Sequence, residues 1–142
     1  MPLPDPKPGL VINYNYLWRD DVEAGREEGR KDRPCVVILA VQNVEGSQIV
    51  TVAPVTHSEP SRPDVAVEMP GPVKKHLGLD DLKSWIVTTE VNRFTWPGSD
   101  LRPISRGRQG VFAYGFVPAD LVRKIRQQIA QRQSVDITRR DG

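Results

Sequence analysis

The sequence predicts a mainly β protein, in which a small and strongly bent antiparallel barrel or half-barrel is followed by one amphipathic helix. Three observations predict this α+β fold class. The 142 residues suit a single domain of ordinary size. β-Branched and aromatic residues gather in about five or six short runs that turn-forming residues separate. The last apolar pattern has helical spacing, with one face formed by Leu121, Val122, Ile125 and Ile129.

The single domain is expected over residues 9–136, between two segments with little capacity to fold. Residues 1–8 carry four prolines and form a proline-rich leader, and residues 137–142 are expected to be a frayed tail. No apolar run approaches the ~20 residues that span a bilayer, and the leader lacks the apolar centre of a signal peptide. These features predict no membrane association and a cytoplasmic protein.

The first half of the domain predicts three strands and one charged loop. Residues 9–16 alternate apolar side chains at period two, which is typical of a strand. Residues 19–32 are almost entirely charged and hold two glycines, which predicts a long mobile loop. The apolar run 35–41 and residues 48–53 flank a turn-forming segment, so they are expected to form a hairpin of a central and a return strand.

The second half predicts shorter elements, separated by proline and glycine. Gly78 is suited to close a helical turn in the left-handed conformation, and Pro118 with Asp120 marks the start of the last helix. The expected elements are the end of the return strand at 54–57, a stiff loop at 58–63, a strand at 64–68, a helical turn at 72–77, a strand at 84–92 and an extended piece at 110–116.

The charge is nearly balanced in total but uneven along the chain. Twenty basic residues against 18 acidic ones leave a net charge of +2, whereas residues 102–142 hold nine basic and three acidic residues. This basic end fits an interface for nucleic acid or for an acidic protein, or only a solvated helix face. Cys35, the only cysteine, and Trp85 are expected in the core. Glycine-rich phosphate loops, nucleophile elbows and histidine pairs at metal-ligand spacing are absent from the sequence, so no metal site is predicted.

Two short motifs in a fixed order carry a family resemblance. A strand and a charged, glycine-bearing loop precede Arg33-Pro34, which opens an apolar strand, and Pro54-Val55-Thr56 ends the next strand. This order resembles the MazF/PemK family of toxin–antitoxin growth inhibitors, and the resemblance covers residues 9 to about 132. It implies an SH3-like antiparallel barrel with a C-terminal amphipathic helix, as in MazF, PemK and CcdB.

The resemblance also implies an activity. Proteins of this kind are homodimeric, metal-independent endoribonucleases without a cofactor, and each is the toxin partner of a cognate acidic antitoxin. They cut single-stranded RNA through its own 2′-hydroxyl and leave a 2′,3′-cyclic phosphate and a 5′-hydroxyl. Arg33 matches the family's catalytic arginine and Thr56 its active-site threonine. The residue types suit this role, because arginine is always charged and grips phosphate oxygens bidentately. Outside the family context, Arg33 equally fits a strand-edge ion pair and Thr56 a turn cap.

His57 stands where the family usually has a small hydroxyl residue. A histidine there could shuttle the proton between the 2′-hydroxyl and the leaving oxygen. It could equally stack on a base, or be an ordinary surface loop residue. We include His57 as the third catalytic candidate. His76, the other histidine, is expected to be structural or solvated.

The RNA-contacting residues are expected before Arg33 and in the later strand: Arg30, Lys31, Glu90, Asn92, Arg93 and Trp96. In the later strand the family shows a glutamine, an apolar residue, a basic residue and a hydroxyl residue. One alignment puts Glu90 at the glutamine and Asn92 at the basic position, and a shift of one residue puts Arg93 at the basic position instead. A slip of one turns every side chain to the other face; we prefer the first alignment. Trp18 and Trp96 are candidates for groove or dimer contacts.

The altered later strand leaves a second function open. In the preferred alignment the site lacks both the family's glutamine and its basic residue. The alternative is a non-catalytic growth inhibitor or a nucleic-acid-binding or protein-binding module on the same fold. Such a protein could resemble the gyrase inhibitor CcdB, or it could be a silent relative with a regulatory role.

Overall fold

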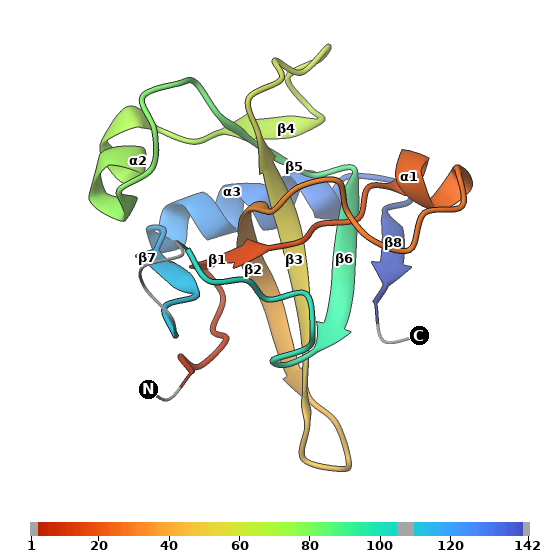
Figure 1. Ribbon diagram of the computed structural model, residues 1–142. Helices are drawn as coiled ribbons and strands as arrows, with labels where there is room; N and C mark the ends of the chain where they lie inside the picture. Colours follow the sequence, from red (N-terminus) through yellow and green to blue (C-terminus); the bar gives the residue numbers. More distant parts are fainter. Residues whose placement is uncertain (1–2, 105–109, 141–142) are drawn as a thin grey trace.

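The strands form one bent sheet that stays open between its two ends (Figure 1). The computed structural model describes residues 3–104 and 110–140. Within these ranges the sheet has eight strands in the order β4-β5-β3-β2-β1-β7, while β6 pairs with β3 and with β8. The elements are β1 (Leu10–Tyr14), α1 (Arg19–Glu23), β2 (Arg33–Gln42), β3 (Gln48–Thr56), β4 (Ala66–Glu68), α2 (Gly71–Leu77), β5 (Trp85–Val87), β6 (Glu90–Thr95), β7 (Ala113–Phe116), α3 (Ala119–Ala130) and β8 (Asp136–Arg139). The predicted fold class, mainly antiparallel β with a C-terminal helix, is confirmed.

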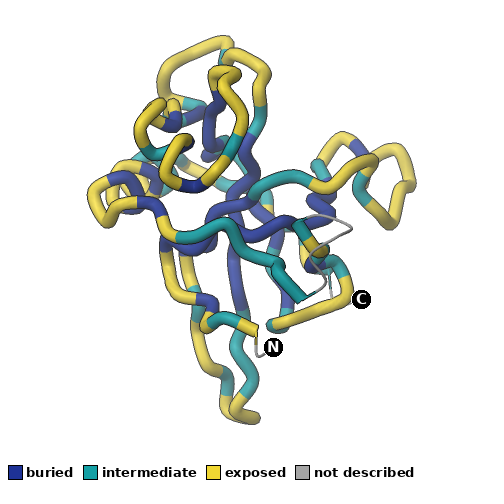
Figure 2. Tube along the Cα trace, turned by 60° about the vertical axis from the view of Figure 1, so that its left-hand side comes forward, coloured by how far each residue is buried: buried dark blue, intermediate teal, exposed yellow. Residues whose placement is uncertain are grey.

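Alternating residues of the central strands face two hydrophobic cores, which explains why these strands are apolar on both sides. In β2, Val36 and Ile38 pack in the core beneath α3, whereas Cys35 and Val37 pack in the second core, around Phe94. Cys35 is fully buried and Trp85 lies in the core, as predicted. Figure 2 shows the buried strands running through the centre of the molecule, with exposed loops around them. The sheet is therefore a central layer with apolar packing on both of its faces.

Strand β3 shares one of its two edges between two partners. Its first half pairs with β6, from Ile49 opposite Thr95 to Val52 opposite Asn92, and its end pairs with β5, where Thr56 lies opposite Trp85. The prediction of one continuous strand over 84–92 is therefore wrong, because the chain leaves the β3 edge between Val87 and Glu90. The return strand ends at Thr56, within the predicted range 54–57, and β5 supplies its last residues with a second partner.

The charged segment 19–32 is not wholly a loop, since its beginning forms the short helix α1. Its first turn is held by hydrogen bonds from the backbone N–H groups of Asp21 and Val22 to the carbonyl of Trp18. The Asp21 side chain is only 5% exposed and forms an ion pair of 3.0 Å with Arg30. This ion pair joins α1 to the end of the same charged segment, a contact that hydrophobic patterning does not predict.

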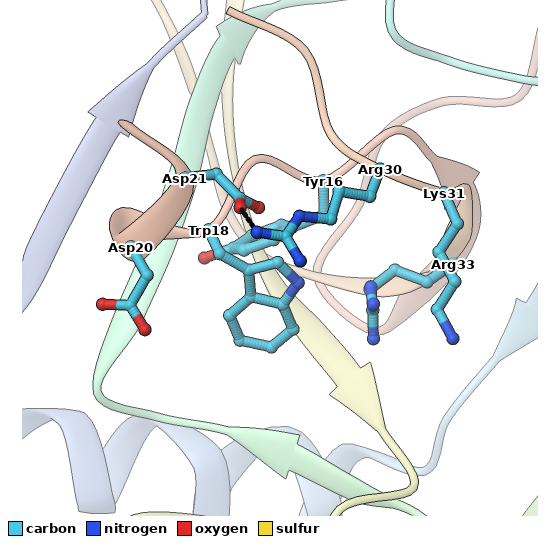
Figure 3. Close-up of a pocket in the computed structure, with 7 residues that line it drawn as sticks. All are labelled: Tyr16, Trp18, Asp20, Asp21, Arg30, Lys31 and Arg33. Atoms are coloured by element: carbon cyan, nitrogen blue, oxygen red, sulfur yellow. Dashed lines mark ion pairs between the residues drawn. The ribbon is translucent and has the colours of Figure 1, made fainter. Parts of the chain in front are cut away.

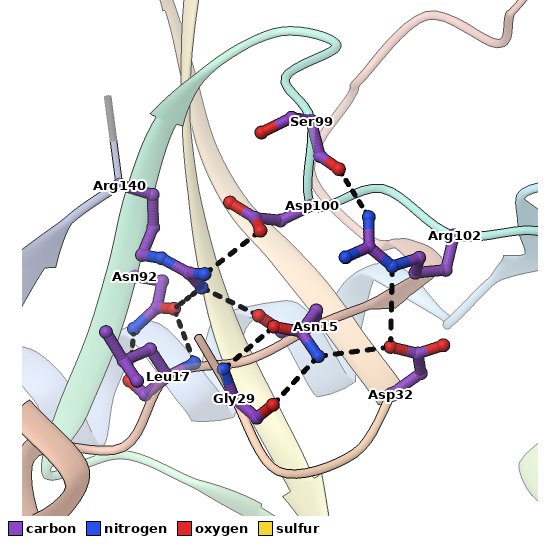
Figure 4. A network of polar contacts seen from close by, with 9 residues as sticks. All are labelled: Asn15, Leu17, Gly29, Asp32, Asn92, Ser99, Asp100, Arg102 and Arg140. Carbon is purple, nitrogen blue, oxygen red and sulfur yellow. Dashed lines mark hydrogen bonds and ion pairs between the residues drawn. The ribbon is translucent and has the colours of Figure 1, made fainter. Parts of the chain in front are cut away.

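The segment predicted as a frayed tail contains β8, so that prediction is wrong for residues 137–139, and residues 141 and 142 lie outside the described part. Strand β8 pairs in parallel with β6, and the register places Ile137 opposite Val91. Beyond β8, the Arg140 guanidinium is inserted into the protein and is 4% exposed. It forms an ion pair of 3.0 Å with Asp100 and donates hydrogen bonds to the Asn15 carbonyl (2.7 Å) and to Asn92 Oδ1 (3.1 Å), as Figure 4 shows.

The remaining elements follow their predictions closely. Helix α2 ends at Gly78, which has a positive φ of 73° as expected for its left-handed cap. Helix α3 starts after Pro118 with Asp120 in its first turn. Of the leader, residues 3–8 are described, and Pro6 is buried. Among the described residues, no helix has the length and apolar character needed to cross a membrane.

Replacing Arg140 by alanine is expected to lower the free energy of unfolding by about 3–5 kcal/mol, since the change leaves the Asp100 carboxylate without its buried cation. Urea unfolding measures the loss. Arg139→Ala, at the exposed neighbouring residue that ends β8, is the matched control and should change stability by less than about 0.5 kcal/mol. Equal effects of the two substitutions would contradict the structural role of Arg140.

Candidate functional site

Arg33 begins β2 at the edge of two recesses. Arg33 lies two residues before the first β2–β3 pair, Cys35 opposite Pro54, and one guanidinium nitrogen donates to the Val55 carbonyl at 3.2 Å. The guanidinium also lies over the Trp18 ring, 4.9 Å from its centroid. Its buried Nε has no hydrogen-bond partner among the described residues. Arg33 is thus a half-buried cation with unused donor capacity.

Burial lowers the pKa of Arg33 from its ordinary value, since desolvation disfavours the charged form. The ordinary pKa of a guanidinium is so high that Arg33 stays charged near neutral pH. It forms no ion pair with any described carboxylate. The site therefore keeps a cation that protein carboxylates leave unpaired, which is the property expected of an anion-binding group.

The first recess, a cavity of about 410 Å³, lies beside the Trp18 ring (Figure 3). Arg33 and Lys31 lie on one side of this ring and Asp20 on the other. Asp21 is paired with Arg30, so it does not neutralise the other two cations. Its lining residues are Tyr16, Trp18, Asp20, Asp21, Arg30, Lys31 and Arg33. The recess combines an aromatic face with positive charge, which suits a base and its phosphate.

The second recess, of about 140 Å³, shares Lys31 and Arg33 with the first. It is also lined by His57 and Asp80, whose Nε2 and Oδ2 atoms are 2.8 Å apart. The other Asp80 oxygen forms an ion pair of 2.6 Å with Nζ of Lys74. The hydrogen bond from Lys74 and the charge of His57 hold the pKa of Asp80 below its usual range. Arg33 therefore stands between an aromatic recess and a recess that carries a histidine–carboxylate pair.

Thr56, the last residue of β3, is half-buried and its hydroxyl oxygen accepts a hydrogen bond of 3.2 Å from the Ser58 N–H. The threonine thus caps the following turn, which is the structural role that its type alone would suggest. A hydroxyl that accepts one hydrogen bond can still donate its own hydrogen. Thr56 is not among the residues that line either recess, whereas its neighbours Val55 and His57 line the second one.

The loop before Arg33 is held by Asn15, a buried residue that follows β1. The Asn15 side chain accepts from the Gly29 N–H at 2.8 Å and donates to the Gly29 carbonyl and to Asp32 Oδ1, each at 3.2 Å (Figure 4). Gly29 approaches the Tyr16 carbonyl so closely that a Cβ atom would lie 2.1 Å from its oxygen. Only glycine fits there, and the loop is therefore more ordered than its charged composition suggests.

The structure does not bring the later-strand candidates to this site. Asn92 is fully buried, where its amide exchanges hydrogen bonds with the backbone of Leu17, so the prediction that it contacts RNA is wrong. Arg93 lies opposite Thr51 and donates to its hydroxyl at 3.1 Å. Trp96 follows the end of β6, where its N–H bonds the Gln48 carbonyl at the opposite end of β3 from Thr56.

Glu90 lies close to the first recess but faces the protein. Its carboxylate accepts hydrogen bonds of 3.0 Å from the Tyr16 hydroxyl and from the Arg19 N–H. Burial raises the pKa of Glu90 above its ordinary value, and these two hydrogen bonds oppose the shift. Glu90 therefore supports Tyr16, which lines the recess, and it is not positioned as an RNA contact of its own.

Asn15 and Asp80 are site residues that no sequence motif predicts. Asn15 interrupts a run of apolar and aromatic residues, and a polar residue inside such a run is the one signal that could have indicated it. Asp80 and His57 are separated in the sequence by β4 and α2 and are brought together by the fold, so no local pattern indicates the pair. Among the described residues, no three His, Cys, Asp or Glu side chains gather to hold a metal ion.

Gly29→Ala is expected to lower the free energy of unfolding by about 1–3 kcal/mol, because the added methyl group meets the Tyr16 carbonyl and the loop must shift. Thermal or urea unfolding measures the change. Gly71→Ala is the matched control, since a Cβ atom there has no neighbour within 4 Å. If both variants are as stable as the wild type, the close approach described for Gly29 is wrong.

Glu90→Gln keeps the shape and the acceptor oxygen of the side chain but removes its titration. The pKa of Glu90 is raised on folding. Such a carboxyl contributes fully to the free energy of unfolding at a pH below the pKa it has in the unfolded chain, and this contribution is lost as the pH rises through the pKa of the folded state. The stability of the variant relative to the wild type should therefore increase between about pH 4 and pH 7. Urea unfolding over this range tests the sign, and a relative stability that falls with pH would contradict it.

Comparison with known proteins identifies the family of the chain. Residues 16–132 match the family model described as "PemK-like, MazF-like toxin of type II toxin-antitoxin system". No curated protein and no solved structure matches the chain significantly. The matched range includes Arg33, Thr56 and most of the sheet, whereas β1, β8 and Arg140 lie outside it. Since the match covers most of its residues, the chain belongs to the family of PemK-like, MazF-like toxins of type II toxin–antitoxin systems.

Proposed function

We propose that this toxin is a metal-independent endoribonuclease that cleaves single-stranded RNA by attack of the RNA's own 2′-hydroxyl. The observation that carries the proposal is the state of Arg33. It is a half-buried guanidinium with an unpartnered Nε, no ion pair among the described residues, and a recess on either side. Such a group stabilises the negative charge that grows on the phosphate oxygens while the 2′-oxygen attacks.

The neighbours of Arg33 suit a nucleotide on each side of the cleaved phosphate. Thr56 follows Val55, whose carbonyl accepts from Arg33, and its hydroxyl hydrogen can be donated to the same phosphate. Trp18 offers an aromatic face to a base, and the cations of Lys31 and Arg30 extend the positive charge along the backbone of the RNA. Arg30 is the weaker candidate, because Asp21 already compensates its charge.

A type II toxin has an antitoxin partner, and we propose an acidic one that docks beside α3 in the cytoplasm. Arg126 donates to the Ile38 carbonyl and Arg132 to that of Asp64, so these two side chains help to hold the helix on the sheet. Arg123 and Lys124 remain exposed on α3. They leave a basic surface to which an acidic segment can bind. We further propose that the toxin is a homodimer, as the family resemblance implies.

A second candidate function is non-catalytic inhibition, such as binding to gyrase in the manner of CcdB. The observation that favours it is the later strand, because Asn92 is buried and Glu90 is turned toward Tyr16. These positions therefore contribute no RNA-reading groups in this structure. Toxicity that a gyrase mutation relieves, with cellular RNA left intact, would support this candidate over the nuclease.

The endoribonuclease proposal predicts that purified protein cuts a long single-stranded RNA in EDTA, with 5′-hydroxyl ends at the cuts. Arg33→Ala should reduce kcat by about 10²–10³-fold, which is the usual effect of removing one preorganised donor to an oxyanion. Arg62→Ala removes an exposed arginine whose recess is separate from the site, so this control should cleave like the wild type. Intact RNA, or undiminished cleavage by Arg33→Ala, would refute the proposal.

A further inference from the structure

Next to Arg33, three side chains from three segments form a hydrogen-bonded series. His57 follows β3, Asp80 follows α2, and Lys74 lies within α2. Nε2 of His57 is 2.8 Å from Asp80 Oδ2, and Asp80 Oδ1 is 2.6 Å from Nζ of Lys74. His57, Asp80 and Lys74 all line the recess that also contains Arg33. The series therefore ends with a histidine ring that faces the space beside the cation.

The carboxylate in this series has little freedom to move. Lys74 is 6% exposed on its side chain and also donates to the Leu82 carbonyl, so its ammonium group is fixed within the protein. The Leu82 N–H in turn donates to Asp80 Oδ1 at 3.1 Å. Asp80 thus has a buried cation and a backbone donor on one oxygen and the histidine on the other. A buried ammonium is costly without its anion, so the Lys74–Asp80 pair is expected to persist when substrate binds.

The fixed carboxylate determines which nitrogen of His57 can act as a base. An ionised carboxylate only accepts hydrogen bonds, so neutral His57 donates its Nε2–H to Asp80. The lone pair is then on Nδ1, which has no hydrogen-bond partner among the described residues. The side chains of His57 and Asp80 are 47% and 49% exposed, so a substrate can reach the ring. The arrangement has the two elements of an oriented base, namely a set tautomer and an accessible lone pair.

We propose that His57 is the general base of the RNA cleavage and that Asp80, held by Lys74, is a positioning residue that sets its tautomer. This inference rests on the proposed endoribonuclease function. Nδ1 of His57 takes the proton of the 2′-hydroxyl while the 2′-oxygen forms its bond to phosphorus. The bond from phosphorus to the 5′-oxygen breaks, and the proton passes to that oxygen from the imidazolium or through solvent. The products are a 2′,3′-cyclic phosphate and a 5′-hydroxyl, and no water is consumed.

Charged groups of both signs surround His57. Asp80 lies beside its ring, and the cations Lys31, Arg33 and Lys74 line the same recess. Asp32 is the second carboxylate of the lining, and it is engaged by Asn15 and by Arg102 at 3.8 Å. Acidification converts the base to its inactive imidazolium form, so cleavage by the wild type should decrease on the acidic side.

The test is the pH profile of kcat on a long single-stranded RNA in EDTA, for the wild type and four variants. His57→Ala should lose about 10²–10⁴ in kcat, the usual contribution of a general base, together with the acidic limb of the profile. Added imidazole should restore part of its rate. Asp80→Asn should lose at least ~10-fold in kcat and change the pH profile, because the His57 ring loses the carboxylate that sets its tautomer. Asp81→Asn and His76→Ala, at exposed positions, should behave like the wild type.

The outcomes separate this inference from the proposed function. If Arg33→Ala abolishes cleavage while His57→Ala keeps the wild-type rate and profile, RNA cleavage stands and the role of His57 is refuted. If His57→Ala is impaired but Asp80→Asn matches Asp81→Asn in rate and profile, the positioning role of Asp80 is refuted. A slow but folded His57→Ala that imidazole does not accelerate argues for a structural effect and contradicts the base. Wild-type protein that leaves RNA intact overturns both proposals.

Discussion

A strand has two hydrogen-bonding edges. In β3 one edge pairs with β2, and much of this structure follows from the way β5 and β6 share the other edge. β6 occupies the edge up to Val52, and β5 occupies it from Val55. Pro54, which has no N–H to donate, lies at the changeover. From Ile86 to Asn92 the chain advances six residues, whereas β3 advances three between their partners Val55 and Val52. Thr88 and Thr89, between β5 and β6, lie outside the strands. The sheet therefore divides into two branches at the end of β3, and the candidate site lies beside this division.

This division explains why the site contains charge at half-buried positions. The branch with β5 carries α2 and the loop with Asp80, whereas the branch with β6 supports Tyr16 through Glu90. Arg33 lies at the start of β2, next to the place where the two branches separate. It is shielded enough to be partly desolvated, yet it opens onto a recess on either side. A site of this kind places an unpaired cation in a medium of lower polarity than water, where its interaction with a phosphate is stronger.

The sequence predicts what depends on local pattern. The hairpin of β2 and β3 follows from alternation and turn residues, and this hairpin brings Arg33 to the carbonyl of Val55, next to Thr56. The contacts that it does not predict join distant parts of the chain. From the sequence, Asn92 is expected at the surface of a strand, whereas in the structure its amide bonds the Leu17 backbone. Likewise, the sequence predicts a polar tail where the structure has β8, which pairs with β6. The short helix α1 depends on burial of the Asp21 carboxylate, which periodicity does not indicate.

The buried Arg140 has a consequence for the order in which the protein can fold during synthesis. Its hydrogen bond to the Asn15 carbonyl joins residues 125 positions apart, and Asn15 in turn holds the loop that leads to Arg33. Contacts of such separation carry a large loop-closure cost and form late. On the ribosome this contact cannot form before residue 140 has been made and has left the exit tunnel. We therefore expect a nascent chain to have its hairpin before its ordered site loop, so that an interrupted translation product carries Arg33 without the framework that holds its loop.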